Sequence, residues 1–269
     1  MPLNYLDVPG FLPIYPLMVI GALVLAYLCG SIPFALIIGR IVAGIDIRQH
    51  GSGNVGTANT LRTLGWGPGL LVFVFDVLKA IVGCLIVTFA LTKVGAILLE
   101  YDPSTLQSAD RFQMAYGITD AGPLHDIPLA LAVIACILGH MFSPFMHFKG
   151  GKGVAAALGG FLVVTPVAAL LAFSVFLLCT LLSRIVSVGS IVAVISLPAW
   201  IAVFHGGSLT YIVFGIMAMM VMVAAHKKNI IRLMHHEEPR FSIGSTKKAL
   251  STEETHGSEE STPAAKDEE

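Results

Sequence analysis

Long apolar segments constrain this chain more than any other feature of the sequence. A helix needs roughly 20 apolar residues to cross the ~30 Å hydrocarbon core of a bilayer. Only 12% of the residues are charged, whereas soluble proteins average about 25%. We therefore predict an all-α polytopic membrane protein. The apolar segments are residues 17–39, 67–92, 128–148, 154–182, 185–204 and 209–225.

The segment 154–182 decides the topology, because Thr165-Pro166 lies near its middle. If this segment is one helix, Lys152 and Arg184 lie on opposite sides of the membrane. If it breaks at Pro166, the two bases share one side, which the positive-inside rule makes cytoplasmic. We predict seven transmembrane helices, with the N-terminus outside and the C-terminus in the cytoplasm. The two halves of the broken segment are short, so they require tilt or local thinning of the bilayer.

Charge separates the chain into two parts. Residues 1–234 carry twelve basic and eight acidic side chains, whereas residues 235–269 carry four basic and nine acidic ones. We assign 1–234 to an integral membrane domain and 235–269 to an acidic, disordered cytoplasmic tail. A basic body suits anionic ligands or lipids. We expect a lipid bilayer around it, and neither a nucleic acid nor an obligate protein partner.

The first cytoplasmic loop, residues 46–62, has the composition of an anion-binding nest. Its glycines let backbone N–H groups approach an anion just before a helix. The spacing also matches a dinucleotide fingerprint, but no strand precedes it, and the Walker A motif fails because Thr57 stands where Lys is required. The alternative is a flexible turn between spans. The candidate binding residues are Gly51, Ser52, Gly53, Asn54, Gly56, Thr57 and Asn59, followed by Arg62.

A second loop, residues 148–153, places two lysines among three glycines at a helix start. This arrangement attracts phosphate, although either lysine alone would be read as a membrane anchor. Ser187 and Ser190, after Arg184, form a further small polar cluster that equally fits helix packing. The candidates in the second loop are Lys149, Gly150, Gly151, Lys152 and Gly153.

His226, Asn229 and Arg232 follow the last apolar segment at helical spacing, so they share one face. A titratable histidine beside an amide and a cation suits phosphate binding or proton transfer. The alternative is a basic stop that contacts anionic lipid.

Few ionisable residues lie inside the apolar segments. Asp76 and Lys79 are helix neighbours, and burial requires them to pair or to line a polar crevice. This pattern fits a structural ion pair and a ligand site equally. His140 and His147 could point inward together, but no third ligand has metal-binding spacing. We predict no metal and no cofactor.

Together these motifs resemble the PlsY family, the bacterial acyl-phosphate:glycerol-3-phosphate acyltransferases. The resemblance runs from about Gly30 to Arg232. It departs from the family pattern at Thr57-Ala58-Asn59, in a longer segment at 93–127 and in the acidic tail. The motifs that carry it are Gly51-Ser-Gly-Asn-Val-Gly56, Asp76–Lys79, Gly139-His140, Phe148-Lys-Gly-Gly-Lys-Gly153, Ser187–Ser190 and His226–Arg232.

The resemblance implies seven transmembrane helices in the bacterial inner membrane, with the active site on the cytoplasmic face. It also implies acyl transfer from acyl phosphate to the 1-hydroxyl of glycerol 3-phosphate, which gives lysophosphatidic acid, the first acylation of phospholipid synthesis. The glycine loop would then hold the donor phosphate. The family's catalytic and glycerol-phosphate positions fall on Ser52, Arg62, Lys152, His226 and Asn229.

The chemistry expected of such a site is positioning and charge neutralisation. An acyl phosphate is a mixed anhydride with a good leaving group. The sequence has neither a Gly-x-Ser-x-Gly elbow nor a His-x4-Asp pair, so we favour direct attack by the glycerol hydroxyl. The base would be His226 or a substrate phosphate oxygen. The competing class is a transporter of an anionic solute or lipid, but the halves do not repeat, and the polar motifs collect at one membrane face.

Overall fold

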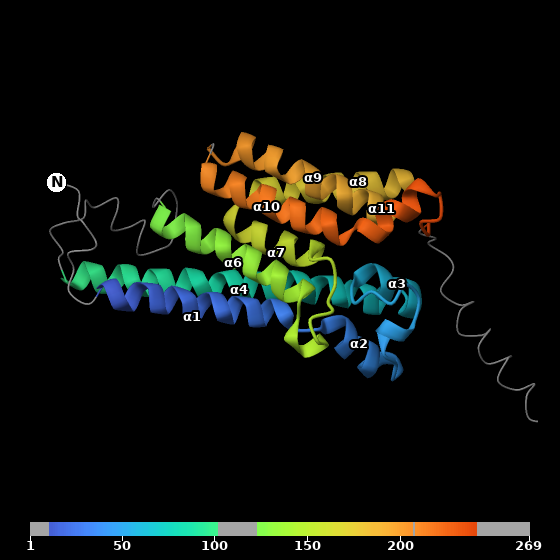
Figure 1. The fold of residues 1–269 in the computed structure, drawn as a ribbon, viewed down its shortest axis with the longest axis horizontal. Helices are drawn as coiled ribbons and strands as arrows, with labels where there is room; N and C mark the ends of the chain where they lie inside the picture. Colours follow the sequence, from blue (N-terminus) through green and yellow to red (C-terminus); the bar gives the residue numbers. More distant parts are fainter. Residues whose placement is uncertain (1–10, 102–122, 207, 241–269) are drawn as a thin grey trace, which may run out of the picture.

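The computed structural model describes residues 11–101, 123–206 and 208–240, and every regular element within them is a helix (Figure 1). Two of the elements are single 3₁₀ turns. The elements are α1 (Phe11–Ser31), α2 (Phe34–Ala43), η2 (Ile47–Gln49), α3 (Thr57–Leu64), α4 (Trp66–Tyr101), α6 (Pro123–Met141), η3 (Pro144–Met146), α7 (Val154–Val164), α8 (Pro166–Ser183), α9 (Val186–Phe204), α10 (Leu209–Ala225) and α11 (Lys227–Met234).

Within the described residues, five segments are long and apolar enough to cross a membrane, and α10 with α11 makes a sixth if the bent pair counts as one span. The two helices of that pair meet at 58°. Helix α7 has 11 residues, so it is about 16 Å long, roughly half the hydrocarbon core. The chain is therefore an all-α, multi-pass integral membrane protein with five or six candidate spans. The five are Tyr15–Ala43, Trp66–Lys93, His125–Met146, Pro166–Ser183 and Val186–Phe204.

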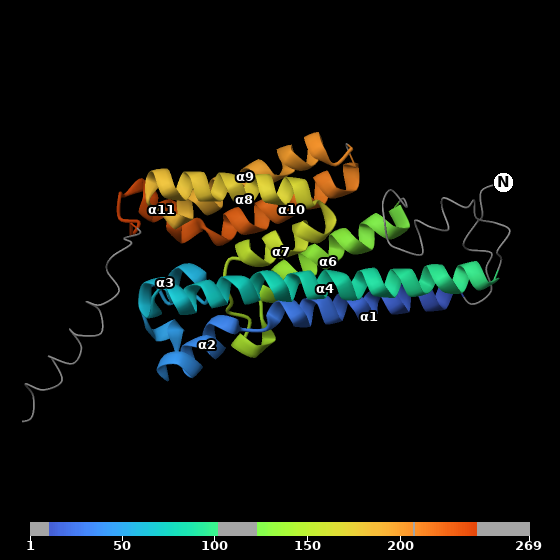
Figure 2. The same ribbon diagram turned by 180° about the vertical axis from the view of Figure 1, so that it is seen from behind.

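The break predicted at Pro166 is confirmed. Helix α7 ends at Val164, Thr165 has an extended φ of −142°, and α8 begins at Pro166. Proline has no N–H and disfavours helical geometry in the residue before it, so a helix readily restarts at this position. Helix α8 then returns toward the end of the bundle where α7 began (Figures 1 and 2).

Two of the expected spans differ from the structure. Residues 17–39 are interrupted, because α1 ends at Ser31 and α2 begins after Pro33. Residues 128–148 end earlier than expected, because α6 stops at Met141 and the chain then turns through η3. His147 is consequently an exposed residue with φ +52°, outside α6. The expectation that His140 and His147 point inward together is wrong.

Small residues bring α1, α4 and α6 into close contact. A Cβ at Gly30 would overlap the Cys136 backbone, and one at Gly139 would overlap the Tyr27 carbonyl. Gly83 is similarly tight against the Cys136 side chain. Membrane helices pack closely where small residues meet, and this packing makes a rigid scaffold beside the loops. Helices α2, α3 and α11 gather at one end of the bundle (Figures 1 and 2).

Candidate active site

The first glycine loop is held by the side chain of Asn59, which is 1% exposed. Its Oδ1 accepts hydrogen bonds from the Ser52 backbone N–H at 2.8 Å and the Ser52 hydroxyl at 3.2 Å, while its Nδ2 donates to the carbonyls of Ile47 and His50. A side chain at Gly51, where φ is +60°, would overlap Asn59 Oδ1. Asn59 therefore shapes the loop from inside.

The C-terminal end of the first glycine loop leads directly into helix α3. Gly53 has φ +70°, and Gly56, beside Asn54, precedes the first residue of the helix, Thr57. The Thr57 hydroxyl is buried and has no hydrogen-bond partner within the described residues. Arg62 lies in the last turn of α3, where burial lowers the pKa of its guanidinium. An unused hydroxyl and a partly desolvated cation are groups that a phosphate can satisfy.

The second glycine loop is fastened to the end of α6. Gly150 N–H donates to the Met141 carbonyl at 2.9 Å, and Gly151 N–H donates to the His140 carbonyl at 3.1 Å. Gly153, with φ +82°, precedes α7. The backbone of this loop also lies against the first loop, because a Cβ at Gly151 would be 3.1 Å from the Val55 carbonyl oxygen.

The two lysines of the second loop have different surroundings. Lys149 is exposed to solvent, and it is not one of the charged groups that interact around Lys152. Lys152 is half-buried, and burial lowers its pKa to about 8. The charge of Glu238 raises this pKa, whereas Arg232 and Arg62 lower it further. Lys152 therefore shares its electrostatic environment with groups from three other segments.

His226 lies at the bend between α10 and α11 and is 1% exposed. Its Nδ1 is 2.7 Å from the Met222 carbonyl oxygen. A carbonyl only accepts, so Nδ1 carries the proton and Nε2 keeps a lone pair. Burial, and next the charge of Lys152, lower the pKa of His226 to about 4. The imidazole is thus neutral near pH 7, with Nε2 available as an acceptor.

Glu238 was not singled out from the sequence, because it lies in the segment assigned to the tail. Its side chain is 2% exposed, and it accepts hydrogen bonds of 2.6 Å from Asn229 Nδ2 and from Arg232 Nε. Burial raises the pKa of the carboxyl, but these hydrogen bonds lower it by more, so it is lowered overall. Glu238 thereby holds the Asn229 amide and the Arg232 guanidinium in place.

The serines at the start of α9 have different roles. Ser190 donates to the Val186 carbonyl within its own helix at 3.0 Å. The Ser187 hydroxyl is buried and lies near enough to Glu238 to lower the pKa of its carboxyl, although no hydrogen bond of good geometry joins the two within the described residues. A Cβ at Gly189 would overlap Thr180 Oγ1 and the Phe176 carbonyl, so α9 packs tightly on α8 here.

Among the described residues, four charged groups around Lys152 influence one another: three cations and one carboxylate, which sum to +2. The cations are Arg62, Lys152 and Arg232, and the carboxylate is Glu238. This excess matches one dianionic phosphate. Asn229 donates to Glu238, and the charges of Lys152 and Glu238 act on His226.

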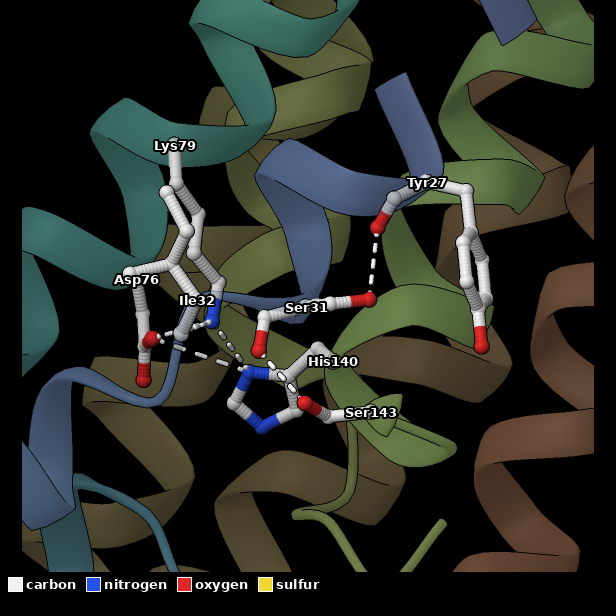
Figure 3. A network of polar contacts seen from close by, with 7 residues as sticks. All are labelled: Tyr27, Ser31, Ile32, Asp76, Lys79, His140 and Ser143. Atoms are coloured by element: carbon white, nitrogen blue, oxygen red, sulfur yellow. Dashed lines mark hydrogen bonds and ion pairs between the residues drawn. The ribbon is translucent and has the colours of Figure 1, made fainter. Parts of the chain in front are cut away.

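Asp76 and Lys79 form a buried ion pair, with Nζ 2.6 Å from Asp76 Oδ1 and each side chain 3% exposed. Lys79 also donates to the Ile32 carbonyl at 2.9 Å and lies 3.0 Å from His140 Nδ1 (Figure 3). Of the two interpretations left open by the sequence, the structure has the ion pair. This polar network joins α4 to the end of α6, directly behind the second glycine loop.

A small apolar pocket with a cavity volume of about 60 Å³ lies beside residues that flank the charged cluster. Val154, which follows the second loop, and Met222, whose carbonyl contacts His226, are two of its lining residues. The remainder of the lining is apolar and comes from α4, α7, α8 and α9. A charged site therefore adjoins an apolar surface that part of an alkyl chain could contact.

Known proteins resemble this chain in sequence and in fold. The family model for glycerol-3-phosphate acyltransferase matches residues 20–236. A glycerol-3-phosphate acyltransferase of Chlorobaculum tepidum is 35% identical over 84% of this chain and 97% of its own length. One from Acaryochloris marina is 38% identical over 87% and 95%, respectively.

Two crystal structures of PlsY (YgiH), an integral membrane glycerol 3-phosphate acyltransferase, also match. The glycerol 3-phosphate form has a TM-score of 0.65 at 34% identity and covers 83% of this chain and 96% of that one. The lysophosphatidic acid form has a TM-score of 0.64 at 33% identity and covers 84% and 96%.

The fold and site thus define an integral membrane acyltransferase of lipid synthesis. The chain belongs to the PlsY family and is a glycerol-3-phosphate acyltransferase. The family resemblance drawn from the sequence motifs is confirmed.

Proposed function

We propose that the protein transfers an acyl group from acyl phosphate to the 1-hydroxyl of glycerol 3-phosphate, giving 1-acylglycerol 3-phosphate and inorganic phosphate. The observation that carries this proposal is the +2 cluster beside an apolar pocket, whose lining includes Val154, next to the second glycine loop, and Met222, which accepts from His226. The cluster suits the phosphate of a small water-soluble acceptor. The apolar pocket suits part of the alkyl chain of a donor that enters from the bilayer.

In the proposed reaction, Arg62, Lys152 and Asn229 bind the phosphate of the acceptor. The glycine loop, with the free hydroxyl of Thr57, receives the phosphate of the donor. Ser52 lies in that loop, with its backbone N–H bonded to Asn59. Ser187 supplies a further hydroxyl beside Glu238, where it helps to lower the pKa of the carboxyl.

The chemical step needs no acyl-enzyme. The 1-hydroxyl oxygen bonds to the acyl carbon, and the bond between that carbon and the phosphate oxygen breaks, releasing phosphate. The hydroxyl proton goes to His226 Nε2 or to a phosphate oxygen of the substrate. Cations and loop N–H groups neutralise the charge that develops during attack.

We also propose seven transmembrane helices in a bacterial inner membrane, with α7 and α8 as the two halves of the broken span, the N-terminus outside and the active site in the cytoplasm. The support is that the Lys152 loop, the Arg184 turn and α11 all lie at one end of the bundle (Figure 1). Cysteines introduced at Arg48, Lys149 and Arg184 should be labelled only from the cytoplasm, and one at Gly206 only from outside. Labelling of the Arg184 position from outside would contradict this topology.

The activity is tested with purified protein in lipid nanodiscs, supplied with palmitoyl phosphate and radiolabelled glycerol 3-phosphate. Lysophosphatidic acid and inorganic phosphate should appear in equal amounts, with the acyl group on the 1-position. A transporter would move the labelled solute across vesicle membranes without forming an ester, and that result would contradict the proposal.

A further inference from the structure

His140 is buried at the end of α6, and its two ring nitrogens have different environments. Nδ1 lies 3.0 Å from Lys79 Nζ, which is itself 2.6 Å from Asp76 Oδ1 (Figure 3). A lysine paired with a carboxylate at this distance is an ammonium, which has donors and no acceptor. Nδ1 is also 3.6 Å from Asp76 Oδ1, which is too long for a hydrogen bond, so its partner is the nearer Lys79 ammonium. Nδ1 therefore accepts from Lys79, which leaves the ring proton on Nε2.

Nε2 faces the place where the two glycine loops meet. A Cβ at Gly151 would overlap Nε2, and that same Cβ would be 3.1 Å from the Val55 carbonyl oxygen of the first loop. Nε2 has no hydrogen-bond partner in the ranges 11–101, 123–206 and 208–240, yet it is not among the polar atoms sealed from solvent. In Figure 3 the ring points Nδ1 toward Lys79 and Asp76 and Nε2 away from them.

We propose that His140 is a further substrate-contacting residue, whose Nε2–H donates a hydrogen bond to the phosphate of the acyl donor where the two glycine loops meet. This inference rests on the proposed function. The buried Asp76–Lys79 pair then has a definite task, because it holds the ring in the Nε2–H tautomer and fixes its orientation. Lys79 and Asp76 are positioning residues, and His140 is the contact.

This role is opposite to that of His226. Met222 accepts from Nδ1 of His226 and leaves a lone pair on Nε2, whereas Lys79 donates to Nδ1 of His140 and leaves a proton on Nε2. One imidazole can accept the hydroxyl proton of the acceptor, and the other can donate to the leaving phosphate. Fixed donors aimed at developing negative charge are a major source of rate enhancement in acyl transfer.

Two substitutions separate contact from structure. In His140→Asn, the amide oxygen can replace Nδ1 as the acceptor for Lys79, but no group reaches the position of Nε2. In His140→Gln, the amide nitrogen reaches the position of Nε2 and restores the donor, but the Nδ1 contact is lost. A purely structural histidine is better replaced by Asn, and a substrate-binding one is better replaced by Gln.

The variants are assayed in nanodiscs with palmitoyl phosphate and glycerol 3-phosphate, and their thermal unfolding is measured in parallel. Relative to wild type, kcat/KM for palmitoyl phosphate should fall about 30-fold or more in His140→Asn and about fivefold or less in His140→Gln, as expected for loss and retention of one charged hydrogen bond. The KM for glycerol 3-phosphate should stay within about twofold. The reverse order of the two variants would overturn the inference, whereas an inactive wild-type protein would overturn the proposed function instead.

A measurement on the wild-type protein covers the case in which His140→Asn does not fold. Protein labelled with ¹⁵N-histidine in micelles is titrated with hexadecylphosphonate, an unreactive analogue of the donor, and the signal of His140 is identified by its loss in His140→Gln. We expect a protonated Nε2, an unprotonated Nδ1 and a shift of the Nε2 resonance on titration. A proton on Nδ1, or an Nε2 resonance unmoved by saturating analogue, would overturn the inference.

Discussion

The Nδ1 atom of His226 donates to the Met222 carbonyl oxygen across 2.7 Å, and this one contact decides which ring nitrogen can act as a base. It leaves Nε2 as the ring nitrogen with a free lone pair. The chain thus supplies an uncharged base without a partner carboxylate on the ring.

Replacement of His226 by Asn tests whether this imidazole takes the hydroxyl proton. The shorter amide can still donate to Met222, so the bend of the chain should persist, but the basic nitrogen is lost. We expect kcat to fall by about 10²-fold or more, as for loss of a general base, with the KM for glycerol 3-phosphate little changed. His235→Asn, at an exposed position of the same region, is the control. Nearly unchanged turnover in His226→Asn would assign the proton to the substrate phosphate.

Lys152 gives the site a dependence on pH. Its pKa is lowered to about 8, so it is cationic below pH 8 and becomes neutral as the pH rises through that value. The KM for glycerol 3-phosphate should therefore increase between pH 7.5 and pH 9.5. In Lys152→Arg the side chain stays charged, so this increase should be absent, whatever the KM at pH 7. A wild-type KM that stays constant over this range would contradict the assignment.

Arg62 can be compared with a matched arginine outside the cluster. Arg62→Ala removes a charged hydrogen bond to phosphate, worth about 2–3 kcal/mol, so kcat/KM for glycerol 3-phosphate should fall roughly 30- to 150-fold. Arg48 is exposed and pairs with Asp46 at 2.6 Å, so Arg48→Ala should retain at least about half of the wild-type value. Steady-state kinetics of the two inserted variants make the comparison. Equal losses would show that general positive charge matters rather than this position.

Two truncations locate the end of the functional chain. Removal of residues after Phe241 keeps Glu238 and should leave specific activity within about twofold, because the removed segment has no apolar periodicity with which to pack. Removal of residues after Glu237 also removes Glu238 and leaves Asn229 and Arg232 without their shared acceptor. We expect a large loss of activity and a lower unfolding temperature, since an uncompensated buried group is costly. If both truncated proteins behave alike, Glu238 does not have this role.

Much of this architecture follows from local sequence rules. Pro166 interrupts an apolar segment that is too long for one short span, and the structure has the break there. The turns in both loops also follow from the sequence. Gly51, Gly53 and Gly153 all have positive φ, a backbone conformation that glycine adopts without strain. The assignment of Asp76 and Lys79 to an ion pair was one of two alternatives. Helical spacing puts the two residues together, but only tertiary packing, with His140 of α6 on one side and Ile32 and Phe34 on another, excludes solvent from them.

Other features depend on tertiary contacts that composition does not reveal. Glu238 lies where the chain becomes acidic, so average composition assigns it to the tail; its value as an acceptor appears only once α11 folds Asn229 and Arg232 toward it. From the sequence, Asn59 was a candidate substrate-binding residue. In the structure, its side chain instead stabilises the first glycine loop through hydrogen bonds to the loop backbone. Residues 241–269 lie outside the described part of the chain, so a disordered tail and the domain boundary at 235 remain predictions.

The central claim is that this site uses a donor with a small phosphate leaving group and needs neither an acyl-enzyme nor a metal. Purified protein should be given palmitoyl phosphate and palmitoyl-CoA separately, each with glycerol 3-phosphate and EDTA, while lysophosphatidic acid is followed. The account predicts turnover with palmitoyl phosphate and none above background with the CoA ester. An equal or faster reaction with palmitoyl-CoA, or loss of the acyl phosphate reaction in EDTA, would contradict it.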